Sequence, residues 1–233
     1  MDYREYFTLR RQSSEFYASF ELPPYLYPVL KEIDDPRILD FGCGFGQMLR
    51  ALARAGLREI EGIDIEPEAI EFCRSQGLKC TNSFEQPGFF EEHSASFDFV
   101  IMSHVLEHFP KEKMIEHLRQ IRNLLRPGGA LILMVPNAQA NTGCYWAFED
   151  FTHHFLFTSG SLFYVLRAAG FNDVEFLDID CTSGLPVWKR AAQRFFLRLY
   201  AANYNFWNKI TGSAFHHSSP LIFSYEIKAV ARV

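Results

Sequence analysis

The sequence lacks a long apolar run, a basic excess and any paired-cysteine motif, and each absence narrows the class of protein. No apolar stretch approaches the roughly 20 residues that a membrane-spanning helix needs. Residues 1–7 also lack the apolar segment of a secretion signal, so we expect a cytoplasmic protein. The five cysteines form no C-x-x-C pair and no metal-binding spacing, which indicates reduced structural thiols.

The charge of the chain is acidic overall but unevenly distributed. A net charge of −5 lacks the basic footprint of a nucleic-acid-binding protein, so we expect no general nucleic-acid binding. Acidic residues are in turn missing from Cys181–Tyr225. The cations of that segment are Lys189, Arg190, Arg194, Arg198 and Lys209. The segment therefore differs in character from the rest of the chain.

The chain is long enough for one α/β domain with a buried core and too short for two ordinary ones, at 233 residues with 48% hydrophobic and 22% charged content. We expect a single domain over residues 1–233. Its expected parts are a helical N-terminal cap (1–35), a core (36–180), a basic aromatic helical insert (181–220) and a last strand (221–233).

Strand and helix patterns alternate along the core, which predicts a doubly wound, Rossmann-like α/β sheet. Strands are expected at residues 37–41, 60–65, 78–82, 97–103, 130–136, 173–179 and 221–232. Helices are expected at residues 47–55, 67–76, 111–125 and 159–169, the third of them closed by Pro127-Gly-Gly129. Because ligands of open parallel sheets lie beyond the carboxyl ends of the strands, the functional candidates are the residues that follow those ends.

The most informative motif is an apolar strand that ends in Asp40 and is followed by three glycines at alternate positions. The glycines are Gly42, Gly44 and Gly46. Such a turn lets the backbone approach a nucleoside-type ligand, because no Cβ stands in the way. A dinucleotide fingerprint, G-x-G-x-x-G, would place its last glycine at position 47, which is Gln47 here, so the motif is D-x-G-x-G-x-G instead.

Two carboxylates at strand ends have both a binding and a structural interpretation. Asp64 ends the second expected strand, where a carboxylate can accept hydrogen bonds from both ribose hydroxyls, or it can cap the helix that begins at Pro67. Asp40 can be a turn residue, or it can hold the amino end of a cofactor, directly or through water. Beside the glycine turn, Asp64 favours a nucleoside-type cofactor.

Four segments in order resemble the class I S-adenosylmethionine (SAM)-dependent methyltransferases. Residues 38–46 are similar to motif I of that family, and residues 62–70 to its acidic-loop motif. Residues 97–110, with Ser103-His-Val-Leu-Glu-His108, are similar to the motif after strand four, and residues 125–132 to the motif before strand five. Each motif is short and weak alone, but four in the right order are specific.

The resemblance implies a seven-stranded sheet with a reversed last strand, SAM as the methyl donor and S-adenosylhomocysteine as the product. It implies that the glycine turn lines the methionine end of SAM, and that Asp64 binds the ribose with Ile65 packing nearby. The family often has an aspartate after strand three, where Asn82 or Ser83 must substitute here. The implied cofactor-binding residues are Asp40, Gly42, Cys43, Gly44, Gly46, Asp64, Ile65, Ser83 and Ser103.

Two polar groups are candidates for the chemistry, because methyl transfer needs an aligned acceptor and, for some acceptors, a base. The first group is His104, Glu107 and His108, which share one face at helical spacing. The second is Asp150-Phe-Thr-His-His154, in the loop before the helix expected from Ser159.

Three interpretations of these groups stay open. Glu107 and His108 can cap and pack the helix after the fourth strand. His104 or His153 can be the catalytic base for a hydroxyl acceptor, a task that a near-neutral pKa suits. In the third interpretation, His104, Glu107, His108 and His153 bind a divalent metal. The spacing H-x-x-E-H with a distant histidine resembles the metal set of small-RNA 3′-end methyltransferases, but the first ligand there is Glu, whereas here it is His. Three histidines and one glutamate suit Mn²⁺ or Zn²⁺ better than Mg²⁺, but we do not expect a metal cofactor.

The cationic segment contains a helical pattern with an apolar face and a basic stripe. The apolar face consists of Trp188, Ala192, Phe195, Leu199, Ala202 and Phe206. The basic stripe is Arg190, Arg194 and Arg198, with Phe196, Tyr200 and Trp207 as an aromatic flank. Such a helix can pack on the domain, form a homodimer through residues 186–210, or act as a cationic acceptor lid or peripheral membrane contact.

The sequence therefore predicts a SAM-dependent methyltransferase, most simply an O-methyltransferase that acts on a small-molecule or sugar acceptor. Segments within residues 136–171 resemble methyltransferases of small metabolites and cell-surface sugars. The alternatives are a SAM-dependent RNA ribose methyltransferase, which the acidic charge disfavours, and a catalytically inactive SAM-binding partner subunit. A NAD-dependent oxidoreductase would share the fold class, but Gln47 breaks its fingerprint.

Overall fold

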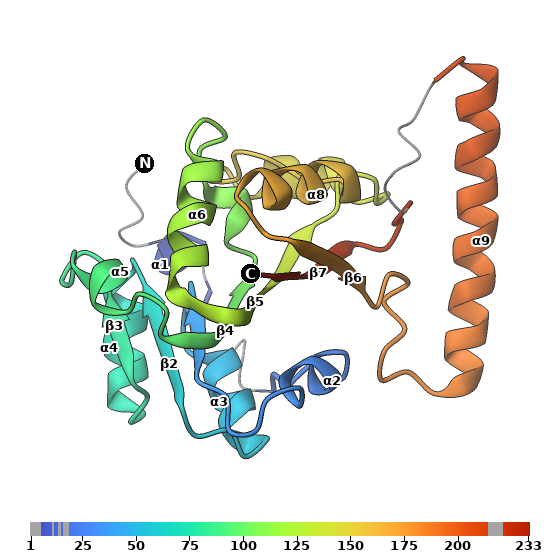
Figure 1. Ribbon diagram of the computed structural model, residues 1–233. Helices are drawn as coiled ribbons and strands as arrows, with labels where there is room; N and C mark the ends of the chain where they lie inside the picture. The colour runs from blue at the N-terminus through green and yellow to red at the C-terminus, as the bar shows by residue number, and fades with distance from the viewer. Residues whose placement is uncertain (1–5, 11, 14, 16–18, 214–220) are drawn as a thin grey trace.

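Seven strands form one sheet in the order β3-β2-β1-β4-β5-β7-β6, with helices on both faces (Figure 1). This computed structural model describes residues 6–10, 12–13, 15, 19–213 and 221–233. The strands are β1 (Ile38–Phe41), β2 (Ile60–Asp64), β3 (Cys80–Asn82), β4 (Phe97–Ser103), β5 (Leu125–Pro136), β6 (Asp173–Leu177) and β7 (Glu226–Arg232). The first five pair in parallel, and β7 runs antiparallel to β5 and β6. The expected α/β fold with a reversed last strand is confirmed.

The helices between the strands follow the apolar periodicity of the sequence. The helices of the described residues are α1 (Tyr6–Leu9), α2 (Leu26–Leu30), α3 (Gln47–Arg54), α4 (Pro67–Ser75), α5 (Phe89–Glu92), the 3₁₀ turn η2 (Leu106–His108), α6 (Met114–Leu124), α7 (Gly143–Glu149), α8 (Ser159–Ala168) and α9 (Val187–Ile210). The short elements α5, η2 and α7 were not predicted, because so few residues leave no recognisable period in the sequence.

β4 is apolar along its length because helices cover both faces of the sheet. Its alternate side chains enter two different cores. Val100 and Met102 pack in the core that includes α6 and α8, whereas Phe99 and Ile101 pack in the core that includes α2 and α3. Burial on both faces fixes the strand in the sheet, so that the residues following β1, β2, β3 and β4 meet at one edge.

The end of α6 differs from the sequence-based expectation. The helix ends at Leu124 and β5 begins at Leu125, so Pro127-Gly-Gly129 lies inside the strand and does not close the helix. The pairing of β4 with β5 shifts register between Phe97 and Phe99. A Cβ at Gly129 would lie 2.9 Å from the Asp98 carbonyl oxygen, so the glycine permits the close approach of the two strands.

The segments outside the core lie at two places around the sheet. The expected N-terminal cap contains α1 and α2 among its described residues. The expected insert contains α9, and its residues 214–220 lie outside the described residues. Figure 1 shows α9 beyond the β6 edge of the sheet, and none of its residues is buried. β7 begins at Glu226, later than the expected 221. Within the described ranges, no helix combines the length and apolar character that crossing a membrane requires.

Candidate active site

The glycine turn after β1 adopts a backbone that L-residues rarely take. Gly42 has φ of +80° and Gly46 has φ of +73°. A Cβ at Gly42 would lie 2.3 Å from Val105 Cγ2, and one at Gly46 would lie 2.6 Å from Leu78 Cδ1. The turn therefore requires glycine at both positions for conformation and for space.

Asp64 ties the tip of β2 to this turn. Its Oδ2 accepts a hydrogen bond of 2.8 Å from the Gly44 amide, and its Oδ1 accepts one of 2.9 Å from the Glu66 amide at the start of α4. Burial raises the pKa of Asp64, although these backbone donors favour the carboxylate. Asp64 thus holds the turn and the residue before α4, and this role is compatible with a ribose contact because Asp64 also lines the cavity beside the turn.

Asp40 lies beneath the turn and is 2% exposed. Among the described residues, its Oδ2 has no hydrogen-bond partner. Burial, and next the negative charge of Asp64, raise the pKa of Asp40 to about 8. A buried carboxyl without a partner is costly, and a positively charged ligand group nearby would offset that cost.

A cavity of about 1240 Å³ opens beyond the carboxyl ends of the strands. Of the cofactor residues expected from the sequence, Gly42, Gly44, Asp64, Ile65, Ser83 and Ser103 line it. Asp40, Cys43 and Gly46 are buried behind the turn and do not line the cavity. Together, the Cβ-free turn, the orphaned Asp40 oxygen and the lining Asp64 fit SAM.

At the tip of β3, Asn82 and Ser83 differ in their contacts and in their access to the cavity. Asn82 is 2% exposed, its Nδ2 donates to the Ile65 carbonyl at 3.2 Å, and its Oδ1 accepts from the Phe84 amide at 2.9 Å. Asn82 is therefore engaged in holding the loop, and Ser83 is the residue of this pair that faces the cavity.

His104 follows β4 with φ of +55°, and its ring lies between two carboxylates. Nε2 is 2.9 Å from Glu226 Oε1, and Nδ1 is 3.4 Å from Glu107 Oε1. The side chain is 46% exposed, and its partial desolvation is outweighed by Glu107 and Glu226, which raise the pKa of His104 to about 10. The ring is therefore an imidazolium at neutral pH, and it lines the cavity.

The two polar groups that the sequence separates meet around Glu107, which is fully buried. His153 Nε2 lies 3.9 Å from Glu107 Oε1 and 3.6 Å from Asp150 Oδ2. The ring of His108 packs edge-on against that of His153, with 4.7 Å between centroids. Ligand atoms of Glu107, His108 and His153 lie within 4.8 Å of one another. His104 is not in this group, and its ring bridges Glu107 and Glu226 instead.

Several charged residues of the site were missed by the sequence analysis. Glu226 and Lys228 come from β7, and both line the cavity. Lys228 Nζ donates a hydrogen bond of 3.0 Å to Asp178 Oδ2. Burial lowers the pKa of Lys228, but Cys181 and the acidic neighbours Glu226 and Asp178 outweigh burial and raise it. The available signal was a glutamate and a lysine two positions apart at the start of a last strand that is apolar from Ala229 to Ala231.

The N-terminal segment also contributes to the site. The Tyr6 hydroxyl and Arg10 Nη1 each lie 2.6 Å from Asp150 Oδ2. Burial works against ionisation of Asp150, but the Thr152 and Tyr6 hydrogen bonds lower its pKa to about 2. The loop before α8 is thereby tied to α1 across the cavity.

Comparisons with known proteins show the family to which the chain belongs. A family model described as a methyltransferase domain matches residues 11–176. A ubiquinone biosynthesis O-methyltransferase of Xanthomonas oryzae pv. oryzae (strain PXO99A) is 34% identical over 106 residues, which cover 43% of each chain. A tRNA U34 carboxymethyltransferase of Shewanella woodyi is 31% identical over 172 residues, covering 68% of this chain and 50% of that protein.

These curated relatives are matched over half of their length or less. The crystal structure of a SAM-dependent methyltransferase from Archaeoglobus fulgidus aligns over 100% of both chains, with a TM-score of 0.66 and 21% identity, which shows a shared fold. The chain belongs to the methyltransferase domain family, and its fold is that of the class I SAM-dependent methyltransferases.

Proposed function

We propose that the protein transfers the methyl group of SAM to a hydroxyl of a small-molecule or sugar acceptor. The observation that carries this proposal is that a single cavity is lined both by the glycine turn with Asp64 and by the charged group His104, Glu226 and Lys228. The first set fits the methyl donor. The second set supplies groups that can hold a polar acceptor and receive its proton.

SAM, when bound, supplies a methyl group activated by its sulfonium charge. The glycine turn would support its methionine end, with the Asp40 carboxylate beneath offsetting the ammonium charge, while Asp64 would hold the ribose hydroxyls. Ser83 would face the base. Exclusion of water and alignment of the acceptor then supply most of the rate enhancement that such a displacement needs.

A hydroxyl acceptor must lose one proton as the new bond forms. We propose that His104 and Glu226 together receive this proton, because His104 Nε2 lies 2.9 Å from Glu226 Oε1 at the cavity wall. Both nitrogens of His104 carry protons at neutral pH, so the acceptor proton goes to Glu226, or to a His104 nitrogen that has passed its own proton to Glu226 or Glu107. His153 would position the group by its contact with Glu107, 3.9 Å away.

An acceptor screen with labelled SAM tests the reaction. Sugar nucleotides, lipid-linked sugars, phenols and RNA form its arms, and transfer to a hydroxyl of a small molecule or sugar is expected. Transfer to RNA alone would replace the proposed acceptor. Calorimetry with SAM, S-adenosylhomocysteine and NAD tests the donor separately, and binding of NAD in place of SAM would overturn the proposal.

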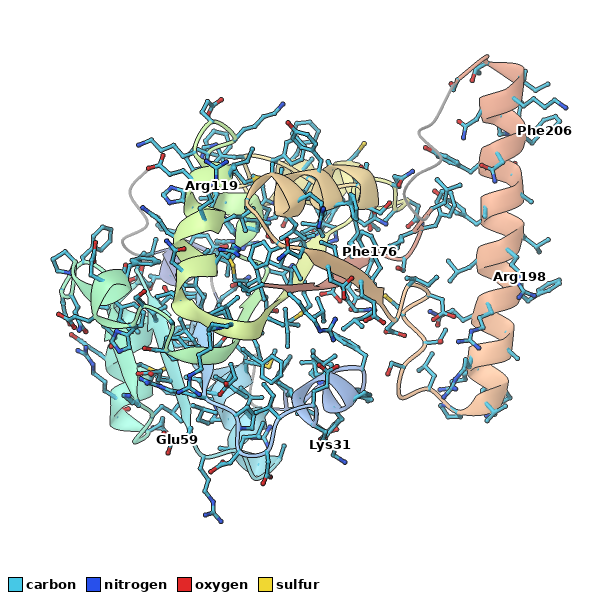
Figure 2. The ribbon with its side chains drawn as sticks, in the orientation of Figure 1. Lys31, Glu59, Arg119, Phe176, Arg198 and Phe206 are labelled. Carbon is cyan, nitrogen blue, oxygen red and sulfur yellow. The ribbon has the colours of Figure 1, made fainter. Side chains whose placement is uncertain are left out.

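We propose further that α9 contacts an anionic lipid surface. Its outward face is apolar and aromatic: Trp188 is 69% exposed, Phe195 57% and Phe206 56%, and Figure 2 shows Phe206 on the side turned away from the sheet. The opposite face meets the domain, where the Tyr204 ring lies 5.0 Å from that of Phe223. Because α9 carries cations and no acidic residue, anionic headgroups complement its charge.

A further inference from the structure

Glu107 is buried in the site with neither of its carboxylate oxygens hydrogen-bonded to a described residue. Its side chain is 0% exposed. The nearest cationic group, His104 Nδ1, is 3.4 Å away and shares its charge with Glu226. A fully buried carboxylate in this state needs a further positive charge or a proton.

Hydrogen bonds fix which nitrogen of each neighbouring histidine carries the lone pair. His153 Nδ1 lies 2.7 Å from the Trp146 carbonyl oxygen, which can only accept, so Nδ1 carries a proton and, in the neutral ring that a metal ion binds, Nε2 carries the lone pair. That Nε2 is the atom 3.9 Å from Glu107 Oε1. Two acceptors therefore face each other.

Hydrogen bonds also fix which nitrogen of His108 carries the proton. Its Nδ1 is 2.8 Å from Thr152 Oγ1, and that hydroxyl donates its hydrogen to Asp150 Oδ1 at 2.6 Å. Thr152 must then accept from His108 Nδ1, which leaves the lone pair of His108 on Nε2. Histidine ligands of metal ions are commonly held by a second-nitrogen bond to a carbonyl or polar oxygen, as both rings are here.

We propose that Glu107, His108 and His153 bind a divalent transition-metal ion. Two imidazoles and one carboxylate form a donor set that suits Zn²⁺, Mn²⁺ or Fe²⁺ better than Mg²⁺. Two ligands held about 2.0 to 2.1 Å from one ion lie roughly 3 to 4 Å apart, which matches the 3.9 Å between His153 Nε2 and Glu107 Oε1. His104 is excluded from the set because both of its nitrogens face carboxylates and carry protons.

The site borders the cavity, since Glu107, His108 and His153 all line it. With three protein ligands, a metal ion keeps open positions that an oxygen of a bound molecule can fill. The binding of the ion rests on the donor geometry alone. Its use in holding an acceptor hydroxyl rests in addition on the proposed methyl transfer.

A second group of potential ligands, Cys43, Cys73 and Cys80, lies buried beneath the glycine turn. Cys73 Sγ donates to the Gly44 carbonyl at 3.3 Å, so this group already has a structural role. An experiment must separate the two groups, and Co²⁺ does so because thiolate ligands give intense charge-transfer absorption that imidazole and carboxylate ligands do not.

The test uses the full chain, stripped with a chelator and titrated with Co²⁺ and Zn²⁺, with elemental analysis for stoichiometry. We expect one ion per chain, visible Co²⁺ bands without thiolate charge transfer, and at least about tenfold weaker binding in Glu107→Gln and in His153→Gln. His117→Gln, which changes a histidine of α6 outside the group, should bind like the unchanged protein. Circular dichroism and SAM calorimetry check that each variant is folded.

Three results would overturn the inference: no bound ion, equal affinity in a folded Glu107→Gln or His153→Gln variant, or thiolate bands that disappear in Cys73→Ser. Because metal binding is measured without an acceptor, failure to find a methylated product would leave these results unaffected. Conversely, a chain that methylates its acceptor yet binds no ion would retain the proposed function and lose the metal site.

Discussion

The Asp64 carboxylate accepts a hydrogen bond of 2.8 Å from the backbone amide of Gly44. Through this contact the tip of β2 and the turn after β1 form one unit, so the groups proposed for the ribose and for the methionine end of SAM are positioned together. A substitution that displaces either the tip of β2 or the glycine turn would therefore disturb both halves of the proposed donor site.

Asp64→Ala should weaken SAM binding by roughly ten- to a hundredfold, because a charged hydrogen bond contributes about 1.5 to 3 kcal/mol. The Gly44 amide also loses its acceptor, so a lower melting temperature should accompany the loss. Calorimetry and thermal denaturation measure the two effects. Asp34→Asn, at an exposed position, is the control. Unchanged SAM affinity in Asp64→Ala would refute the ribose role.

The elevated pKa of Asp40 predicts a pH dependence with a definite sign. The folded state raises this pKa from 3.8 to about 8, so the folded protein keeps a proton that the unfolded chain loses, and stability falls as pH rises from about 4 to about 8. Thermal stability of the SAM-free protein should fall across that window and level off above pH 8, while SAM affinity should rise toward pH 8, since the carboxylate form offsets the ammonium charge. Both slopes should flatten in Asp40→Asn. Equal slopes in the variant would assign them to other groups.

The glycine turn allows a matched pair of substitutions. Gly42 and Gly56 both have positive φ, but a Cβ at Gly42 would lie 2.3 Å from Val105 Cγ2, whereas one at Gly56 meets nothing within 4 Å. Gly42→Ala should therefore cost more than Gly56→Ala, by about 1 to 3 kcal/mol in the free energy of unfolding. It should also weaken SAM binding. Denaturant titration measures the stability difference, and equal losses would mean that Val105 yields freely.

The donor site could be predicted from the sequence because its residues are local to the motifs. The turn glycines and Asp64 follow strand ends whose apolar runs mark them plainly, and parallel pairing brings such ends to one edge. The strand-three tip required the structure, since only the hydrogen bonds of Asn82 show why Ser83 faces the cavity.

The acceptor side could not be predicted in the same way. His104 and Glu226 are separated by 122 positions, and their contact depends on β7 inserting antiparallel between β5 and β6. The meeting of Glu107 with His153 depends likewise on a loop that returns over the cavity. For α9, the periodicity predicted the helix, but whether its apolar face packs inward is a tertiary property that periodicity does not encode.

His104 and Glu226 should be separable from donor binding. His104→Gln and Glu226→Gln should each lower the methylation rate by about 10² to 10⁴, the usual contribution of proton transfer, and leave SAM affinity within a few-fold. Glu175→Gln on the edge strand β6, whose exposed side chain lies outside the cavity lining, is the matched carboxylate control. The acceptor found in the screen is the substrate for these rates. Full activity in both variants would remove the pair from the mechanism.

The outward face of α9 predicts binding to anionic vesicles. The full chain should float with phosphatidylglycerol vesicles but not with phosphatidylcholine vesicles, and added salt should weaken the association, because each Lys or Arg near such a surface contributes about 1 kcal/mol. Phe195→Ser with Phe206→Ser should abolish flotation, whereas Phe84→Ser, a 74% exposed phenylalanine outside α9, should not. A different result would contradict this prediction: the unchanged chain does not float, but it elutes as a dimer in chromatography, and the two α9 substitutions abolish the dimer. A second copy of the chain would then cover this face.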